Sequence, residues 1–220
     1  MEDALEDFVR NGGTLVCEGC PGYYGDRGRA GESQPNLGLD ELFGARQAWV
    51  QFTPDLLDDL RITLDDGTRI RGGVFLQAYT PTTGQARARY ADGRIAMVDH
   101  RLGKGRTRLI GSFPGYAYNR SQDPATGRFF ADLLAWAGRT QHVAASDPRI
   151  IARLHTSRQS AFLWVINSTR DDIPTRLTLS PSWAEFDDCR PRMGDVQPTR
   201  AAGTTRVTVP ARQGVGLQLH

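Results

Sequence analysis

The sequence predicts a truncated α/β domain with a strand meander, followed by a small all-β domain. Near the N-terminus, a helix-like run ends at a glycine pair and leads into a short apolar strand, as in α/β folds. In the middle, alternating apolar and polar segments are separated by Asp-Gly pairs, which indicate antiparallel hairpins. In the last third, alternating segments recur with turns about every eight to twelve residues, which is typical of a β-sandwich.

The N-terminal elements are a helix and a buried strand. Apolar side chains recur at helical spacing at Ala4, Leu5, Phe8 and Val9. Gly12 and Gly13 stop the helix, and residues 14–17 (TLVC) follow as a strand of the parallel-sheet type. Because a helix that leads into a parallel strand is normally preceded by another strand, we expect the first part of this domain to lie elsewhere, either removed or on another polypeptide.

The middle of the chain is predicted to be a strand meander. Residues 22–40 lack periodicity and are expected to form a long loop, followed by a short helical turn that ends at Gly44. Two hairpins are centred on Asp66-Gly67 and Asp92-Gly93, where both central turn residues are expected to have positive φ. A further turn at residues 103–106 (GKGR) leads into a strand that returns to the sheet.

The boundary between the two domains follows a helix. This helix is amphipathic and closed by Gly138, and its apolar positions are Phe129, Phe130, Leu133, Leu134 and Ala137. The polar stretch after it is typical of a linker, and we place the boundary between Gln141 and Asp147. The predicted domains therefore span residues 1–142 and 147–220.

Composition argues against several classes of partner and site. The 220 residues carry a net charge of +2, and the arginines are scattered singly among aspartates, so we expect no nucleic-acid partner. No run of about 18 apolar residues is present and the acidic N-terminus lacks a signal core, so we expect a cytoplasmic protein with no membrane partner. Cys17 and Cys20 are far from Cys189, and the histidines are isolated, so we predict free thiols, no metal and no cofactor.

Cys20 lies where an amidotransferase-type nucleophile elbow, Gly-x-Cys-x-Gly, would follow a strand. Gly22 matches the trailing glycine, but Glu18 occupies the leading position, where a tight turn favours no side chain. A nucleophilic thiol also needs a base, and the expected His-x-Glu pair is absent because His100 is followed by Arg-Leu. We therefore predict no catalytic residue, with Cys20 and His100 as the alternative.

Other candidate sites have simpler interpretations. His100 is interpreted as a polar residue at a strand end, and the GKGR turn as a basic tip, because no Ser or Thr follows its lysine as in a P-loop. Sugar hydrolysis usually needs two carboxylates. No such pair is evident among Glu2, Glu6, Glu18, Glu32, Glu41 and Glu185. Asp26 is interpreted as a solvated loop acid, with contact to a ligand or partner as the alternative.

Aromatic residues flank two predicted loops. They are Tyr23, Tyr24, Tyr116 and Tyr118. Aromatic loops can stack on sugars or anchor protein interfaces. We favour core packing or a subunit contact for these side chains, with sugar binding as the alternative.

Several segments together resemble a known family. They are residues 5–29 (LEDFVRNGGTLVCEGCPGYYGDRGR), 38–46 (GLDELFGAR), 99–115 (DHRLGKGRTRLIGSFPG) and 129–138 (FFADLLAWAG). In this order they resemble the trimerisation domain of glycoside hydrolase family 42 β-galactosidases, an amidotransferase-like α/β domain that lacks catalytic residues. The tail, residues 162–179 and 207–220, resembles the small β-sandwich that ends those enzymes.

The resemblance implies a non-catalytic role. In that family a (β/α)8 barrel precedes these domains and carries both catalytic glutamates. Such a barrel takes about 250 residues, so no catalytic residue of the family can be transferred to this sequence. We therefore expect the C-terminal part of a β-galactosidase-like protein, serving assembly and active-site shaping. The expected partners are further copies of the chain or a separate catalytic barrel polypeptide, with a galactoside as candidate ligand. The alternatives are a free-standing Cys20 hydrolase and a carbohydrate-binding module.

Overall fold

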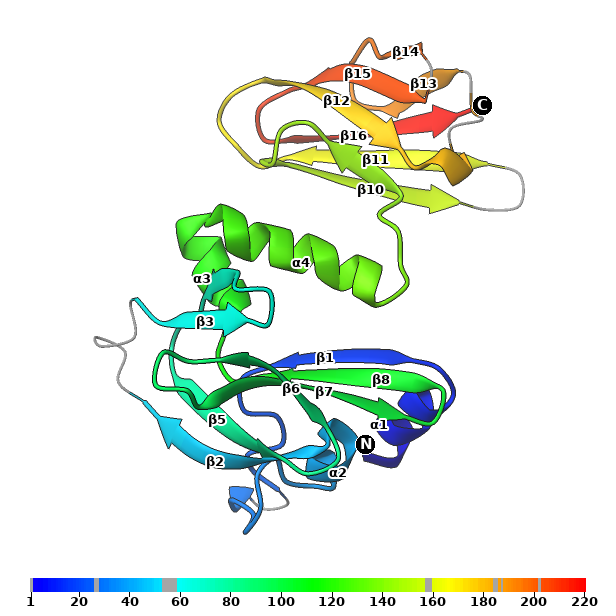
Figure 1. Cartoon of the computed structure of the whole chain (residues 1–220). Helices are drawn as coiled ribbons and strands as arrows, with labels where there is room; N and C mark the ends of the chain where they lie inside the picture. The colour runs from blue at the N-terminus through cyan, green and yellow to red at the C-terminus, as the bar shows by residue number, and fades with distance from the viewer. Residues whose placement is uncertain are drawn as a thin grey trace. The chain divides into compact units, whose positions relative to one another are not determined.

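The computed structural model of the chain describes residues 2–25, 28–52, 59–156, 160–183, 186, 188–201 and 203–220. The chain forms two compact units, residues 1–137 and 138–220 (Figure 1). Strands hold more residues than helices in both units, and most strand pairs of the first unit are antiparallel, so the α/β character predicted for the first domain is only partly present. None of the described helices is long and apolar enough to span a membrane.

The first unit has an eight-stranded sheet at its centre. Its strands are β1 (Thr14–Glu18), β2 (Ala45–Gln51), β3 (Arg61–Leu64), β4 (Arg69–Arg71), β5 (Leu76–Pro81), β6 (Gln85–Arg89), β7 (Ile95–Leu102) and β8 (Gly105–Ile110). The strand order is β1-β8-β7-β6-β3-β4, and β5 pairs with both β7 and β2. β1 lies parallel to β8, whereas the other pairs are antiparallel. Short turns join the consecutive paired strands β3–β4, β6–β7 and β7–β8, which is possible only between antiparallel neighbours.

Both predicted Asp-Gly hairpins are confirmed. β3 pairs with β4 around Asp66-Gly67, and β6 pairs with β7 around Asp92-Gly93. The two glycines have φ angles of 83° and 86°, but the aspartates before them do not have positive φ, so that part of the prediction is wrong. Instead, each aspartate side chain accepts a hydrogen bond from the backbone N–H two residues further on, at 2.8 Å for Asp66 and 3.0 Å for Asp92. The carboxylates thereby stabilise the turns in an Asx-type arrangement.

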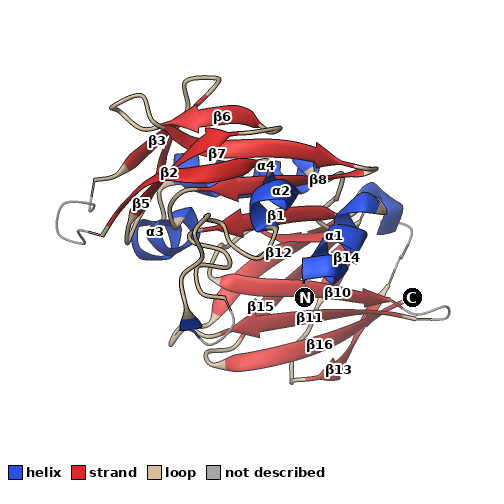
Figure 2. Ribbon diagram, turned by 90° about the horizontal axis from the view of Figure 1, so that it is seen from below, coloured by secondary structure: helices blue, strands red, loops and turns tan. Residues whose placement is uncertain are grey.

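Helices cover both faces of this sheet (Figures 1 and 2). They are α1 (Glu2–Arg10), α2 (Leu39–Phe43), α3 (Pro114–Ser121) and α4 (Pro124–Trp136). On one face, α1 and α2 pack against Val98 and Leu109. On the other face, α4 packs against Met97 and Ile110. Because Met97 and Val98 are consecutive in β7, their side chains point to opposite faces and so serve two separate cores.

Two helical features differ from the expected ones. Residues 114–121 (PGYAYNRS) form α3 although they show no apolar period, and Pro114 lies at the helix start, where its missing N–H has no cost. Tyr116 and Tyr118, which were expected to flank a loop, therefore lie on a helix. In α1, Phe8 was expected on the buried face but is 53% exposed, whereas Val9 is fully buried.

The second unit consists of two antiparallel sheets around one core. Its strands are β9 (Val143–Ala145), β10 (Ile150–Thr156), β11 (Ala161–Asn167), β12 (Ile173–Leu179), β13 (Cys189–Met193), β14 (Thr199–Ala201), β15 (Thr204–Val209) and β16 (Gln213–Leu219). The strand orders are β10-β11-β16-β13 and β14-β15-β12-β9. Leu163 and Leu217 of the first sheet share a core with Leu177 and Val207 of the second. Strand β9 lies in the stretch expected to be a linker and pairs with β12.

Candidate functional site

The turn after β1 resembles the predicted nucleophile elbow only in outline. Gly19 follows the strand with φ of 74°, and its N–H donates to the carbonyls of Ile110 and Ser112 at 3.0 and 3.1 Å. A Cβ atom at position 19 would collide with the ring of Phe113. The turn is therefore packed tightly, with the glycine where no side chain can fit.

The thiol of Cys20 lacks the features of an activated nucleophile. Cys20 is half-buried and packs beside the core under α4. Burial is the main cause that raises its pKa to about 11, and the neighbouring Cys17 also has a pKa of about 11. A catalytic thiolate needs the opposite shift. All three cysteines are free thiols.

His100 is engaged at a different place in the unit. Its Nδ1 lies 3.0 Å from the carbonyl oxygen of Leu42 in α2, and its Nε2 lies 3.1 Å from the hydroxyl of Thr83. A carbonyl can only accept, so Nδ1 donates to Leu42, and in the neutral ring Nε2 accepts from Thr83. Within the described residues, no hydrogen bond joins His100 to Cys20. The structure does not bring the two alternative catalytic residues together.

The candidate carboxylates are dispersed. Glu18 is half-buried and its Oε1 accepts a hydrogen bond from the backbone N–H of Gly115 at 2.9 Å. Glu6 pairs with Arg10 on the exposed surface of α1 at 2.6 Å. Asp26 and Glu185 lie outside the described residues. In the part of the chain that the structure describes, no group of three or more metal-ligating side chains gathers.

The tyrosines separate into two local arrangements. The rings of Tyr23 and Tyr24 meet edge to face, with centroids 5.4 Å apart. On α3, Tyr118 lies 6.1 Å from Phe130 of α4, and Tyr116 is 48% exposed beside Arg120. Tyr118 therefore serves helix packing, whereas Tyr24 and Tyr116 offer exposed aromatic surface.

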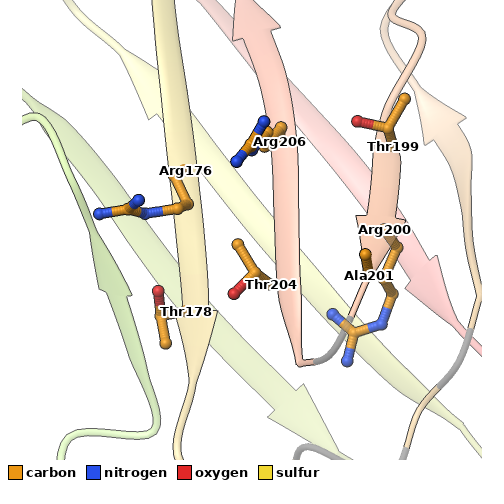
Figure 3. Close-up of a pocket in the computed structure, with 7 residues that line it drawn as sticks. All are labelled: Arg176, Thr178, Thr199, Arg200, Ala201, Thr204 and Arg206. Carbon is orange, nitrogen blue, oxygen red and sulfur yellow. The ribbon is translucent and has the colours of Figure 1, made fainter.

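An open cavity of about 490 Å³ lies on the sheet face formed by β12, β15 and β14 (Figure 3). It is lined by Arg176, Thr178, Thr199, Arg200, Ala201, Thr204 and Arg206. Arg176 and Arg206 are directly opposite each other on neighbouring strands. The guanidinium group of Arg176 nevertheless extends away from Arg206, and Arg200 is held by the carbonyl of Phe186 and the hydroxyl of Thr205. This wall is basic, but its guanidinium groups do not converge.

A smaller cavity of about 200 Å³, which we term the Trp136 pocket, lies in the first unit. It is lined by Thr83, Gln85, Arg87, Asp99, His100, Arg101, Arg106 and Trp136. Sequence reasoning missed it because its arginines are scattered singly along the chain. One signal was available in the sequence. Asp99 and Arg101 are two residues apart, as are Arg106 and Arg108, and side chains two apart in a strand share a face.

Comparison with known families supports the resemblance inferred from the sequence. Residues 1–138 match the model of the beta-galactosidase trimerisation domain. No curated protein matches the chain in sequence.

Solved glycosidase structures share the fold over the whole chain. The beta-galactosidase from Bacillus circulans sp. alkalophilus is 17% identical with a TM-score of 0.71, over 100% of this chain and 31% of that chain. The beta-galactosidase from Halorubrum lacusprofundi is 19% identical with a TM-score of 0.65, over 99% of this chain and 29% of that one. Alpha-L-fucosidase isoenzyme 2 from Paenibacillus thiaminolyticus is 15% identical with a TM-score of 0.57, over 99% of this chain and 38% of that chain.

The chain thus spans about three tenths of the length of the β-galactosidases it matches. At these identities the structural likeness establishes the fold alone. The family model, in contrast, covers more than half of the sequence. On that ground the chain belongs to the beta-galactosidase trimerisation domain family.

Proposed function

We propose that this chain is a non-catalytic, C-terminal part of a β-galactosidase-like glycoside hydrolase. Its role is assembly and the shaping of the surroundings of an active site that other residues supply. The observation that carries this proposal is the match of residues 1–138 to a trimerisation domain. The dispersed carboxylates and the unactivated Cys20 thiol support the non-catalytic part of it.

The finer assignment of the first unit is to the amidotransferase-like α/β domains. Support comes from the parallel pairing of β1 with β8 and from the glycine-flanked turn that places Cys20 directly after β1. Glu18 then occupies the position of the leading glycine, and its carboxylate binds the start of α3. In this proposal a structural contact has replaced the catalytic elbow.

The proposed partner is a further copy of the chain or a catalytic barrel on another polypeptide. β1 is the edge strand of the described sheet, and Val16 on it is 36% exposed. Large apolar side chains nearby in the sequence are also open to solvent, with Phe8 at 53% and Tyr24 at 66%. Unpaired strand edges and exposed apolar side chains favour association with other chains.

Light scattering coupled to size exclusion tests the self-association arm. We expect a mass above the 24.3 kDa of one chain, reduced to one chain by Phe8→Glu and by Tyr24→Glu. Leu134→Glu on α4 is the matched control, because Leu134 is 43% exposed but lies outside the proposed contact. The assembly role is contradicted if two results are found together. The parent chain stays a monodisperse monomer at high concentration, and it does not bind a supplied barrel polypeptide.

The non-catalytic role is tested with nitrophenyl galactoside as substrate. We expect no turnover that co-elutes with the purified chain. Activity that co-purifies and persists in a host without its own galactosidases contradicts the proposal. Activity that disappears with Cys20→Ser would instead favour the Cys20 hydrolase.

A second candidate function, carbohydrate binding, rests on the outer face of β11. Phe162 and Trp164 stack there with centroids 6.5 Å apart and ring planes 23° apart. The indole lies over Gly216, where a Cβ atom would come within 2.9 Å of it. Two nearly parallel rings on an open sheet face offer stacking surface to a sugar chain. Affinity electrophoresis in a galactan gel tests this, with Trp164→Ala expected to lose retardation and Trp49→Ala, which is half-exposed in the other unit, expected to keep it.

A further inference from the structure

In the eight-stranded sheet of the first unit, the face beneath α4 changes from apolar to charged along its length. Phe129, at the middle of α4, packs in one cluster with Met97 and Ile110. Two residues further along each strand, β7 carries Asp99 and β8 carries Arg108, which are directly paired in register. A further two residues along the same strands, Arg101 of β7 lies directly opposite Arg106 of β8. The polar end of this face lies where α4 ends at Trp136.

Asp99 and Arg108 form a fixed ion pair in this face. Arg108 Nε and Nη2 donate to the two carboxylate oxygens of Asp99, both at 2.7 Å, and the side chains are only 12% and 15% exposed. The guanidinium of Arg108 also lies 4.2 Å from the centroid of Trp136. Bidentate geometry and cation–π contact together hold this arginine in place. The charge of Asp99 is therefore already engaged by Arg108, with Arg87 a further 3.5 Å contact.

The remaining basic groups exceed the acids around the Trp136 pocket. Four guanidinium groups lie there, and their ion pairs involve two carboxylates, those of Asp99 and Asp65. The four belong to Arg87, Arg101, Arg106 and Arg108. Within the described residues, no ion pair or hydrogen bond engages the guanidinium of Arg101 or Arg106. Arg106 instead lies 5.0 Å from the centroid of Trp136. Like charges directly opposite on neighbouring strands destabilise a sheet, so an anion between them would relieve repulsion.

One neutral donor, the side-chain amide of Gln85, is added to the wall of this pocket. The hydroxyl of Thr83 is used by His100. The side-chain oxygen of Gln85 accepts from Arg87 at 2.7 Å, which directs its amide nitrogen away as a donor. Guanidinium forks and an amide N–H are the donors that bind a tetrahedral oxyanion with several acceptor oxygens. The volume of about 200 Å³ admits a small group and not an extended chain.

We propose that the Trp136 pocket binds a phosphate group, as inorganic phosphate or as the phosphate of a small sugar ester. The excess of two positive charges matches a phosphate dianion better than a carboxylate. Arg101 and Arg106 hold the phosphate oxygens, with Gln85 as an added donor. Arg108 and Asp99 act as positioning residues that fix Trp136 and, through its ring, Arg106.

Isothermal titration of the full chain at constant ionic strength tests this proposal, with inorganic phosphate, a hexose phosphate and acetate as separate probes. We expect phosphate binding that Arg101→Gln weakens at least tenfold, because one charge-assisted contact is lost. Arg176→Gln is the matched control, because Arg176 is also directly opposed by an arginine but lies on the open face of Figure 3. Equal unfolding midpoints of both variants in chloride show that they are folded.

The probes separate the two sources of phosphate. Tighter binding of the hexose phosphate indicates that the sugar also contacts the pocket, whereas equal binding assigns the site to the phosphate group alone. The proposal is overturned if the parent chain binds no phosphate, if acetate binds equally well, or if Arg176→Gln weakens binding as much as Arg101→Gln.

Discussion

Glu18 Oε1 accepts a hydrogen bond from the backbone N–H of Gly115 at 2.9 Å. This contact joins the end of β1 to the first turn of α3, where backbone N–H groups have no partner within the helix. Burial raises the pKa of Glu18, and the bond from Gly115 partly offsets that effect. Glu18, which occupies the position of the leading glycine of the elbow, thus caps the first turn of α3.

Glu18→Ala is expected to lower the free energy of unfolding by about 1 kcal/mol, the usual cost of a lost cap. Glu18→Gln keeps an acceptor oxygen and removes a half-buried charge, so it should cost less. Because the folded pKa lies above the unfolded one, the charge penalty is absent below pH 4.5 and grows as pH rises through the folded pKa. Urea unfolding should therefore show that the free energy of unfolding of Glu18→Gln, relative to that of the parent, is higher at pH 7 than at pH 4. A glutamine variant as unstable as the alanine variant at both pH values contradicts the cap.

Cys17 and Cys20 should react slowly with alkylating reagents at neutral pH. Because burial raises both pKa values from 9.0 to about 11, the thiolate fraction at pH 8 is about 100-fold lower than for an unperturbed thiol. We expect the alkylation rate, followed by peptide mass spectrometry, to rise about tenfold per pH unit up to pH 11. Stability from the protonated thiols should be complete below pH 9 and decrease as pH rises through 11. Rapid labelling of Cys20 at pH 7 would show an activated thiol and revive the hydrolase hypothesis.

Asp99→Asn should destabilise the first unit by about 2 kcal/mol, because it leaves the largely buried Arg108 without its carboxylate. The indole fluorescence should also change, since Arg108 and Arg106 both lie on Trp136. Asp65→Asn is the matched control, because Asp65 pairs with Arg87 only at 3.7 Å and is 65% exposed. Equal unfolding midpoints for the two variants would argue against a fixed ion pair.

Asn167→Ala should destabilise the second unit by about 3 kcal/mol, because it leaves the buried carbonyl of Val209 and several partly buried groups without partners. Its Nδ2 donates to the carbonyls of Asp171, Val209 and Pro210 at 2.8, 2.9 and 3.2 Å. Its Oδ1 accepts from the backbone N–H and the hydroxyl of Thr169 at 3.0 and 2.7 Å. Thr169→Val removes only the hydroxyl and should cost clearly less in thermal unfolding. The opposite order of the two variants would show that Asn167 does not join these turns.

The sequence by itself determined the local elements of this fold. Period-two alternation predicted most of the strands, and Asp-Gly pairs located two hairpins, because turn chemistry acts over only a few residues. The order of glycine and apolar segments was also sufficient to identify the family. The sequence also showed that no glutamate follows His100 in a His-x-Glu pair, whereas its hydrogen-bond partners, Leu42 and Thr83, became known only from the structure.

Tertiary structure decided what depends on distant segments. Helix α3 has no apolar period, and contacts such as Glu18 with Gly115 join residues 97 positions apart. The pairing of β1 with β8 and the exposure of Phe8 also follow from packing. The Trp136 pocket gathers arginines from β6, β7 and β8 beneath the end of α4. Each of these arginines appears isolated in the sequence, because charges on neighbouring strands become adjacent only when the sheet forms.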